Sequence, residues 1–214
     1  MKYFFLDTSN SRLLLAIYKN KNCLAYYNEP CDNNLSANIM PIIDKIFTET
    51  KTSPWDIDKI FVVNGPGSFT GVRIGVTIAK TYAWAFGIDI IPISGLEVLA
   101  SSKFRSDIVV PLIDARRNNV YAGMYDKNLN KLREDCYINL GDLQEQSSGK
   151  KYIFTSYDKF ENIDKIMIPK VRIWNVLKKH LNDEPTNQHH LNPNYLKLTE
   201  AEEKLKNDKN INVR

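Results

Sequence analysis

A strand, a glycine-rich turn and an apolar helix follow one another in the most informative part of the chain. Residues 59–86 read KIFVVNGPGSFTGVRIGVTIAKTYAWAF. The apolar run at 59–64 predicts a buried strand, the glycines break it sharply, and 72–86 have the spacing of a helix. Polar side chains form only a narrow stripe on this helix, so most of its circumference must be covered. The residues fit both a helix inside a single core and a helix covered by a second protein.

The glycine turn carries only part of a phosphate-binding motif. Backbone N–H groups at a helix start attract anions, and Ser68 or Thr70 is the expected N-cap. A P-loop requires a second glycine followed by lysine, but Thr70 stands at that position. The dinucleotide fingerprint also fails, because Thr70 stands where its third glycine belongs. We therefore interpret the turn as structural or partner-facing.

The flanking segments alternate strand and helix patterns. Runs at 3–6, 12–18 and 22–27 predict a three-stranded meander, and isoleucines spaced by three and four predict a helix over about 36–51. We expect Pro41 in the first turn of that helix or at a bend. A strand at 89–93 and a helix from 96 to 101 complete the order βββαβαβ. This order favours parallel strands covered by helices.

The pattern starts again in the second half of the chain. At an offset of 107 residues, Leu6-Asp7 falls on Ile113-Asp114, and each pair ends an apolar run. The later elements are predicted as strands at 108–114, 119–125, 132–138 and 151–155, a helix at 172–181, an extended segment at 189–196, a charged helix at 200–206 and a frayed end at 207–214. We predict a duplicated α/β protein with an N-terminal, partner-binding domain at 1–102 and a smaller C-terminal domain at 103–214.

Composition excludes several classes of protein. The 214 residues are 43% hydrophobic and 25% charged, as in globular proteins. No apolar run approaches the roughly 20 residues of a membrane helix, and no signal peptide pattern opens the chain, so we expect a cytoplasmic protein without membrane contact. Three cysteines without a C-x-x-C pair argue against a disulfide framework or zinc knuckle. The net charge of +4 arises entirely after residue 100, a mild bias that allows only weak or assisted contact with RNA.

Few residues have the arrangement that catalysis requires. Asp7 and Asp114 end apolar strands, where an aspartate can hold hydrated Mg²⁺ beside a phosphate or bond its own turn. The three histidines, the first of which is His180, form no metal-binding array, and no nucleophile elbow occurs. We therefore predict no catalytic residue and no metal site.

Several motifs resemble those of one family. They are Asp7-Thr8-Ser9, the stretch Gly65-Pro66-Gly67-Ser68-Phe69-Thr70-Gly71-Val72-Arg73-Ile74-Gly75, Ile113-Asp114-Ala115-Arg116 with Val120-Tyr121, and Pro193-Asn194-Tyr195-Leu196. The chain is similar in these motifs, over about 1–125 and again at 193–196, to the TsaB family, also called YeaZ. That family is a bacterial subunit of the machinery that places threonylcarbamoyl on adenosine 37 of tRNAs.

The resemblance implies a fold and a set of partners. The fold is the actin-like, sugar-kinase-like (ASKHA) duplication of two α/β domains. The implied role is a noncatalytic scaffold that dimerises with itself when alone and with a TsaD-type transferase when it is present, in an assembly that includes a TsaE-type ATPase and contacts tRNA through the complex. The residues expected at this partner interface are Gly65, Gly67, Phe69, Thr70, Gly71, Arg73, Ile74, Val76 and Lys80.

One motif departs from the family pattern. Many members carry His-Ser or His-Thr ahead of Leu-Pro or Met-Pro in the first helix, whereas this chain has Leu35-Ser36 ahead of Met40-Pro41. TsaD-type subunits use two histidines of that helix to bind metal. Because no histidine precedes His180, the chain resembles the noncatalytic paralogue and not the transferase.

An enzyme of the same fold is the alternative. A small-molecule kinase or ATPase would use Asp7, Thr8 and Asp114 around Mg-ATP, since one fold supports many activities. The small second domain and the absence of a recognisable adenosine site in 140–190 argue against it. On the scaffold interpretation no cofactor is needed, and the same three residues form a vestigial site with weak ATP or ADP binding at most.

Overall fold

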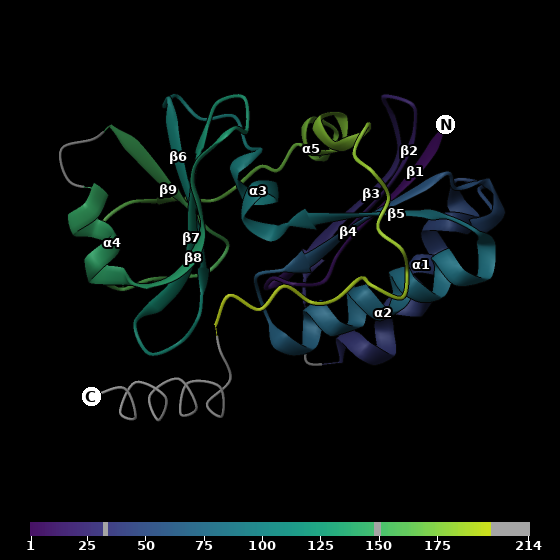
Figure 1. The fold of residues 1–214 in the computed structure, drawn as a ribbon, viewed down its shortest axis with the longest axis horizontal. Helices are drawn as coiled ribbons and strands as arrows, with labels where there is room; N and C mark the ends of the chain where they lie inside the picture. The colour runs from purple at the N-terminus through teal and green to yellow at the C-terminus, as the bar shows by residue number, and fades with distance from the viewer. Residues whose placement is uncertain (32–33, 148–150, 198–214) are drawn as a thin grey trace, which may run out of the picture.

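Two five-stranded mixed sheets stand side by side, each with its own helices (Figure 1). The structure, a computed structural model, describes residues 1–31, 34–147 and 151–197. The first sheet has the order β3-β2-β1-β4-β5. Its strands are β1 (Lys2–Asp7), β2 (Arg12–Lys19), β3 (Asn22–Pro30), β4 (Lys59–Gly65) and β5 (Asp89–Ser94). The first three strands form the predicted antiparallel meander, and β4 and β5 extend the sheet in parallel.

The second sheet repeats this order. It runs β10-β9-β6-β7-β8, so that each strand occupies the place of the strand five positions earlier. Its strands are β6 (Ile108–Asp114), β7 (Asn119–Asp126), β8 (Lys131–Asn139), β9 (Tyr152–Thr155) and β10 (Ile166–Met167). Asp7 and Asp114 end the two corresponding strands. The prediction of a duplicated fold with two α/β domains is confirmed.

The helices form two layers against the first sheet. On one face lie α1 (Leu35–Glu49) and α2 (Phe69–Phe86), and between the two sheets lie α3 (Gly95–Ala100) and α5 (Ile173–His180) (Figure 1). Successive side chains of β1 alternate between the faces, so Phe4 packs towards α1 and α2 while Phe5 packs towards α3 and α5. The core on the α3 and α5 side of the first sheet continues into the second sheet through Val109 and Tyr125. Apolar packing therefore joins the two domains.

The second repeat lacks one helix. There α4 (Leu140–Ser147) occupies the place of α1 and covers Val110, Leu112 and Val120 of its sheet. Residues 156–165, between β9 and β10, contain turns and no helix, although α2 stands at this place in the first repeat. The described part of the second domain is thus smaller, and the glycine turn with its helix belongs to the first repeat alone.

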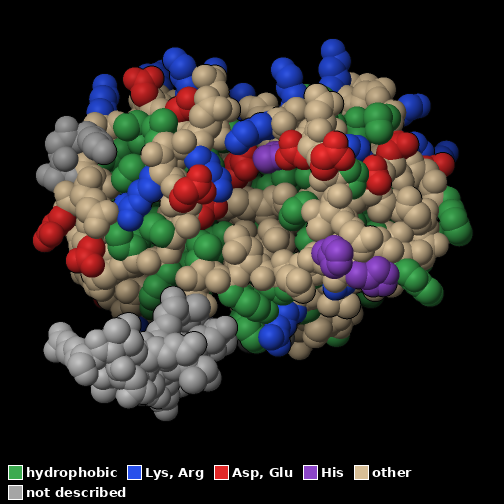
Figure 2. Space-filling model, in the orientation of Figure 1, with side chains coloured by type: hydrophobic (Ala, Val, Ile, Leu, Met, Phe, Trp, Pro, Cys, Tyr) green, Lys and Arg blue, Asp and Glu red, His purple; other side chains and the backbone are tan. Residues whose placement is uncertain are grey.

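Charged side chains gather over the junction of the domains (Figure 2). Glu97 of α3 is buried and accepts hydrogen bonds from Lys179 Nζ at 2.8 Å and His180 Nε2 at 3.1 Å. Burial alone would raise the pKa of Glu97, but these bonds outweigh it and lower the pKa. Burial likewise opposes the charge of His180, yet its bonds to Glu97 and Asp183 raise its pKa. The cluster fastens α5 to α3.

Element boundaries differ from the predictions in detail. Pro41 lies in the second turn of α1, because that helix begins at Leu35. The short 3-10 helix η1 (Pro54–Asp56), α4 and β10 were not predicted. The predicted helix at 200–206 and the frayed end at 207–214 lie outside the described residues. The division at residue 102 stays a prediction. Among the described residues, no helix combines the length and the apolar character needed to cross a membrane.

Candidate functional site: the glycine turn and the face of α1 and α2

The glycine turn packs against two other segments of the chain. Gly65 has a φ of +128°, and a β-carbon there would lie 2.5 Å from the carbonyl oxygen of Asn194. Both the conformation and the close approach require glycine. A β-carbon at Gly71 would collide with the carbonyl oxygen of Thr8, whose Oγ1 donates a 2.6 Å hydrogen bond to the Gly71 carbonyl. The turn is therefore fixed between the segment after β1 and the end of the described chain.

Side-chain capping starts α2 directly after the turn. Ser68 is the N-cap, and its Oγ accepts a hydrogen bond from the Gly71 N–H at 3.3 Å. This places one of the two predicted capping residues at the cap itself and leaves Thr70 exposed in the first turn.

The C-terminal strap, residues 186–197, runs from the edge of β5 along α2 (Figure 1). Its Thr186 N–H donates to the Ile90 carbonyl at 2.8 Å, and its Asn194 N–H donates to the Asn64 carbonyl at 2.7 Å. Between them, Leu191 is 2% exposed and packs into the core between α2 and the sheet. The strap thus closes one side of the predicted interface helix with residues from the far end of the chain.

An aromatic cluster joins the strap to the start of α2. The guanidinium carbon of Arg73 lies 3.8 Å from the ring centroid of Phe69, and the ring of Tyr195 stacks on Phe69 at 5.0 Å. Arg73 Nε also donates a 2.8 Å hydrogen bond to the Tyr195 hydroxyl. Because Phe69 remains 51% exposed, the cluster presents an apolar and cationic surface to the outside.

A shallow apolar groove of about 410 Å³ separates α1 from α2. Met40, 45% exposed, and Phe69 stand among its lining residues, and Trp84 further along α2 is 73% exposed. The groove is also lined by Ile39, Arg73, Ile74, Thr77 and Ile78. Exposed apolar side chains of this size, gathered on one face, are typical of interaction surfaces.

The nine residues expected at the interface fall into three groups. Phe69, Thr70, Arg73 and Ile74 line the groove. Lys80 is tied to the strap, where its Nζ donates to the Leu191 carbonyl at 3.2 Å. The remaining four shape the turn or the core: Gly65, Gly71 and Val76 are buried, and Gly67 is half-buried against Ser9.

Three surface residues complete this face beyond those expected. Met40, Trp84 and Tyr195 all had a signal in the sequence: Met40 stands in the departing motif, Trp84 in the apolar helix and Tyr195 in the C-terminal motif. Their exposure could not be inferred, because the pairing of α1 with α2 and the path of the strap determine it.

The two aspartates considered for a nucleotide site each bond their own turn. Asp7 is fully buried, and its carboxylate accepts from the Ser9 N–H at 2.8 Å, Ser9 Oγ at 2.6 Å and Asn10 Nδ2 at 3.1 Å. Burial raises the pKa of Asp7 against these bonds. Asp114 is exposed, and its Oδ1 accepts from the Arg116 N–H at 2.8 Å. Thr8 is engaged by Gly71, so all three side chains have partners within the chain.

The described residues include no cluster of side chains suited to binding a metal ion. Across 1–31, 34–147 and 151–197, no group of three or more His, Cys, Asp or Glu side chains is arranged to hold an ion.

The architecture and the glycine turn define a class of protein. Two α/β domains repeat one strand order, and a single glycine-turn helix belongs to the first of them. The family model described as TsaD, tRNA N6-adenosine threonylcarbamoyltransferase, matches residues 29–173. Within this group, the chain belongs to the TsaB family.

Curated relatives carry that family name. The tRNA threonylcarbamoyladenosine biosynthesis protein TsaB of Bacillus subtilis is 34% identical over 95% of this chain and 97% of its own length. TsaB of Buchnera aphidicola subsp. Acyrthosiphon pisum is 32% identical over 75% of this chain and 69% of its own. The solved structure of YeaZ from Pseudomonas aeruginosa superposes with a TM-score of 0.77 at 18% identity, covering 91% of this chain and 99% of that one, and shows the same fold.

Proposed function

We propose that this protein is a noncatalytic subunit of tRNA threonylcarbamoyladenosine biosynthesis. In this role it pairs with a TsaD-type transferase, which modifies adenosine 37 of tRNA, and with itself when that partner is absent. A TsaE-type ATPase joins the assembly, and tRNA is contacted through the complex. Membership of the TsaB family supports the process, and the exposed apolar face of α1 and α2 supports the pairing.

The groove between α1 and α2 is the observation that carries the proposal. Burying Met40, Phe69 and Trp84 would remove large apolar side chains from water, at roughly 25 cal/mol per Å². Arg73, already stacked on Phe69, supplies a fixed cation beside this surface, and Arg with aromatic residues is the composition of interface centres. The strap keeps this surface in place, since its Tyr195 holds both Phe69 and Arg73.

The scaffold role assigns no acid, base, nucleophile or metal to this chain. Asp7 and Thr8, the residues that an ATP-dependent enzyme of this fold would use, are bonded to Ser9, Asn10 and Gly71. Their task in the proposed function is to fix the turn after β1 against the glycine turn and so to hold the start of α2.

Light-scattering mass tests the proposal. The purified protein should be a homodimer alone and a one-to-one heteromer after mixing with a TsaD-type subunit. Met40→Glu places a carboxylate in the groove at an exposed position, where it does not disturb the core. Moving this carboxylate from water into an apolar interface is unfavourable, so both complexes should weaken at least about tenfold.

A matched control uses the second domain. Leu132 is 53% exposed on β8, and Leu132→Glu makes the same kind of change outside the groove. It should leave both masses unchanged. The proposed interface would be refuted if the protein is monomeric and does not bind the TsaD-type subunit, or if both variants weaken the complexes equally.

A further inference from the structure

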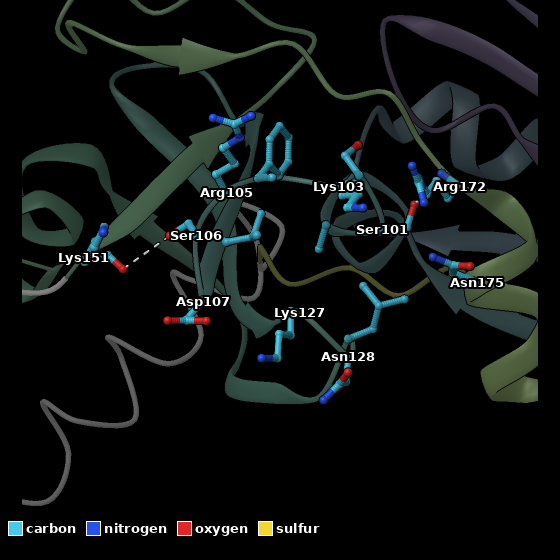
Figure 3. Close-up of a pocket in the computed structure, with 15 residues that line it drawn as sticks. Ser101, Lys103, Arg105, Ser106, Asp107, Lys127, Asn128, Lys151, Arg172 and Asn175 are labelled. Atoms are coloured by element: carbon cyan, nitrogen blue, oxygen red, sulfur yellow. Dashed lines mark hydrogen bonds between the residues drawn. The ribbon is translucent and has the colours of Figure 1, made fainter.

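A hollow of about 490 Å³ lies where the two domains are joined (Figure 3), and none of its lining residues belongs to α1 or α2. It is formed by the loop between α3 and β6, the turn between β7 and β8, and the residues just before β9 and α5. We refer to it as the loop pocket. Val109, at the start of β6, lines it, whereas Asp114 ends the same strand. At about 3.3 Å per residue, the five residues of strand from Val109 to Asp114 place the pocket about 16 Å from Asp114, one of the candidate nucleotide-site residues.

Positive charge surrounds the loop pocket on several sides. Its cationic lining residues come from four separate segments and are Lys103, Arg105, Lys127, Lys151 and Arg172. A single acidic residue, Asp107, lines it with them. None of the five cations forms an ion pair with another described residue. Concentrating like charges in a concave site raises its free energy unless an anion binds there.

Polar groups with free hydrogen-bonding capacity accompany these charges. Ser102 lines the pocket and is 6% exposed, yet its Oγ has no hydrogen-bond partner within the described chain. A buried hydroxyl without a partner is unfavourable, and an acceptor that reaches it from the pocket would remove that cost. The exposed amides of Asn128 and Asn175 also line the pocket.

The walls of the pocket are fixed by hydrogen bonds of their own. Ser101 Oγ accepts from the Arg172 N–H at 2.9 Å and donates to the Val98 carbonyl at 2.6 Å. Ser106 Oγ is within hydrogen-bond distance of the Ile108 carbonyl at 3.0 Å and of the Lys151 carbonyl at 3.4 Å (Figure 3). These contacts tie the loop between the domains to α5 and to the start of β9. Four of the five cations, all except Lys127, are therefore carried on connected segments and not on independent loops.

We propose that the loop pocket binds phosphate groups. A terminal phosphate carries a charge of about −2 at neutral pH and a backbone phosphodiester about −1, and the acceptor oxygens of both match the surplus of cations and the unpartnered serine hydroxyl. Two sources supply this chemistry: a small phosphorylated molecule such as a nucleoside diphosphate, and the backbone of RNA. Neither requires the groove between α1 and α2, so the proposal is independent of the partner interface.

Binding measurements on the whole protein distinguish the two sources. Calorimetric titration with ADP and with pyrophosphate measures small phosphorylated ligands, and fluorescence anisotropy with a labelled single-stranded RNA of about 20 nucleotides measures the backbone. The double variant Lys103→Glu with Arg105→Glu should weaken whichever probe binds by at least tenfold. Lys45→Glu with Lys51→Glu changes the net charge equally on α1 and just after it, at exposed positions, and should change the affinity less than twofold.

The variant Ser102→Ala distinguishes binding at a specific site from nonspecific electrostatic attraction. Removing the hydroxyl should weaken ADP or pyrophosphate binding about fivefold while the unfolding midpoint of the free protein stays the same or rises, because an unsatisfied group is lost. Binding of ADP or pyrophosphate assigns the site to small ligands, and binding of RNA alone assigns it to the backbone. If only RNA binds, its affinity should fall in the Lys103→Glu, Arg105→Glu double variant and stay unchanged in the Lys45→Glu, Lys51→Glu double variant. No binding of any probe, or equal loss in both charge-reversed pairs, overturns the proposal.

Discussion

Truncation of Leu191 should release the C-terminal strap as a unit. This side chain is 2% exposed, and it is the strap residue that enters the core between α2 and the first sheet. Leu→Ala at a buried site costs about 2–5 kcal/mol, from lost transfer energy and the cavity left behind. The strap is otherwise held by backbone hydrogen bonds, by the Lys80 and Asn64 side chains, which donate to its carbonyls, and by the Tyr195 cluster on the surface. Local release is therefore the cheapest response of the chain to Leu191→Ala.

Hydrogen exchange measures this release directly. The amides of Thr186 and Asn194 donate to the Ile90 and Asn64 carbonyls and report the two ends of the strap. A loss of 2 kcal/mol corresponds to about a thirtyfold faster exchange of both amides, with the interior of β4 unchanged. Ile168→Ala, at a 74% exposed position, is the control and should leave both rates as they are.

Two outcomes would refute this reasoning. If both amides keep their protection, Leu191 does not anchor the strap. If only one of them exchanges faster, the strap does not behave as a cooperative segment, and its hold on α2 depends on separate local contacts.

Two further predictions concern the domain junction and the glycine turn. The pKa of His180 is raised in the folded state, so its stabilising contact with Glu97 is fully present below the unfolded pKa of about 6.5 and is lost as pH rises through the folded pKa. Thermal unfolding between pH 6 and 9 should show this decline in the wild-type protein and a flatter profile in His180→Gln; identical profiles would contradict it. Gly65→Ala should lower the free energy of unfolding by more than about 2 kcal/mol, because φ is +128° and the new methyl meets the Asn194 carbonyl at 2.5 Å. Gly87→Ala, at a φ of +69° with no atom within 4 Å, should cost only about 1 kcal/mol in urea unfolding, and equal losses would show that the strap does not crowd the turn.

The arrangement of strands followed from the sequence to a large extent. The meander, the strand before the glycine turn and the repeat of Asp7 by Asp114 all predicted the observed order, because period-two burial and turn residues are local signals. The elements η1, α4 and β10 were not predicted, because segments of three, eight and two residues are too short to show a clear periodicity.

The candidate site was accessible to sequence reasoning in part. The apolar character of α2 predicted a covered surface and the motif around Tyr195 carried the family resemblance, but nothing in the sequence showed that these segments meet. The loop pocket had no signal of this kind, because Lys103, Lys127, Lys151 and Arg172 are dispersed among ordinary polar residues.

The sequence by itself determined the class of fold, the family and the position of the glycine turn. These depend on local geometry: a left-handed φ, a helix cap and alternating burial are specified by neighbouring residues. Only the tertiary structure decided which side of α2 is buried, which is held by the strap and which faces outward, and it alone gathered five cations around one hollow. Contacts between residues more than 100 positions apart, such as Arg73 with Tyr195, arise from the packing of the whole chain, for which no local pattern exists.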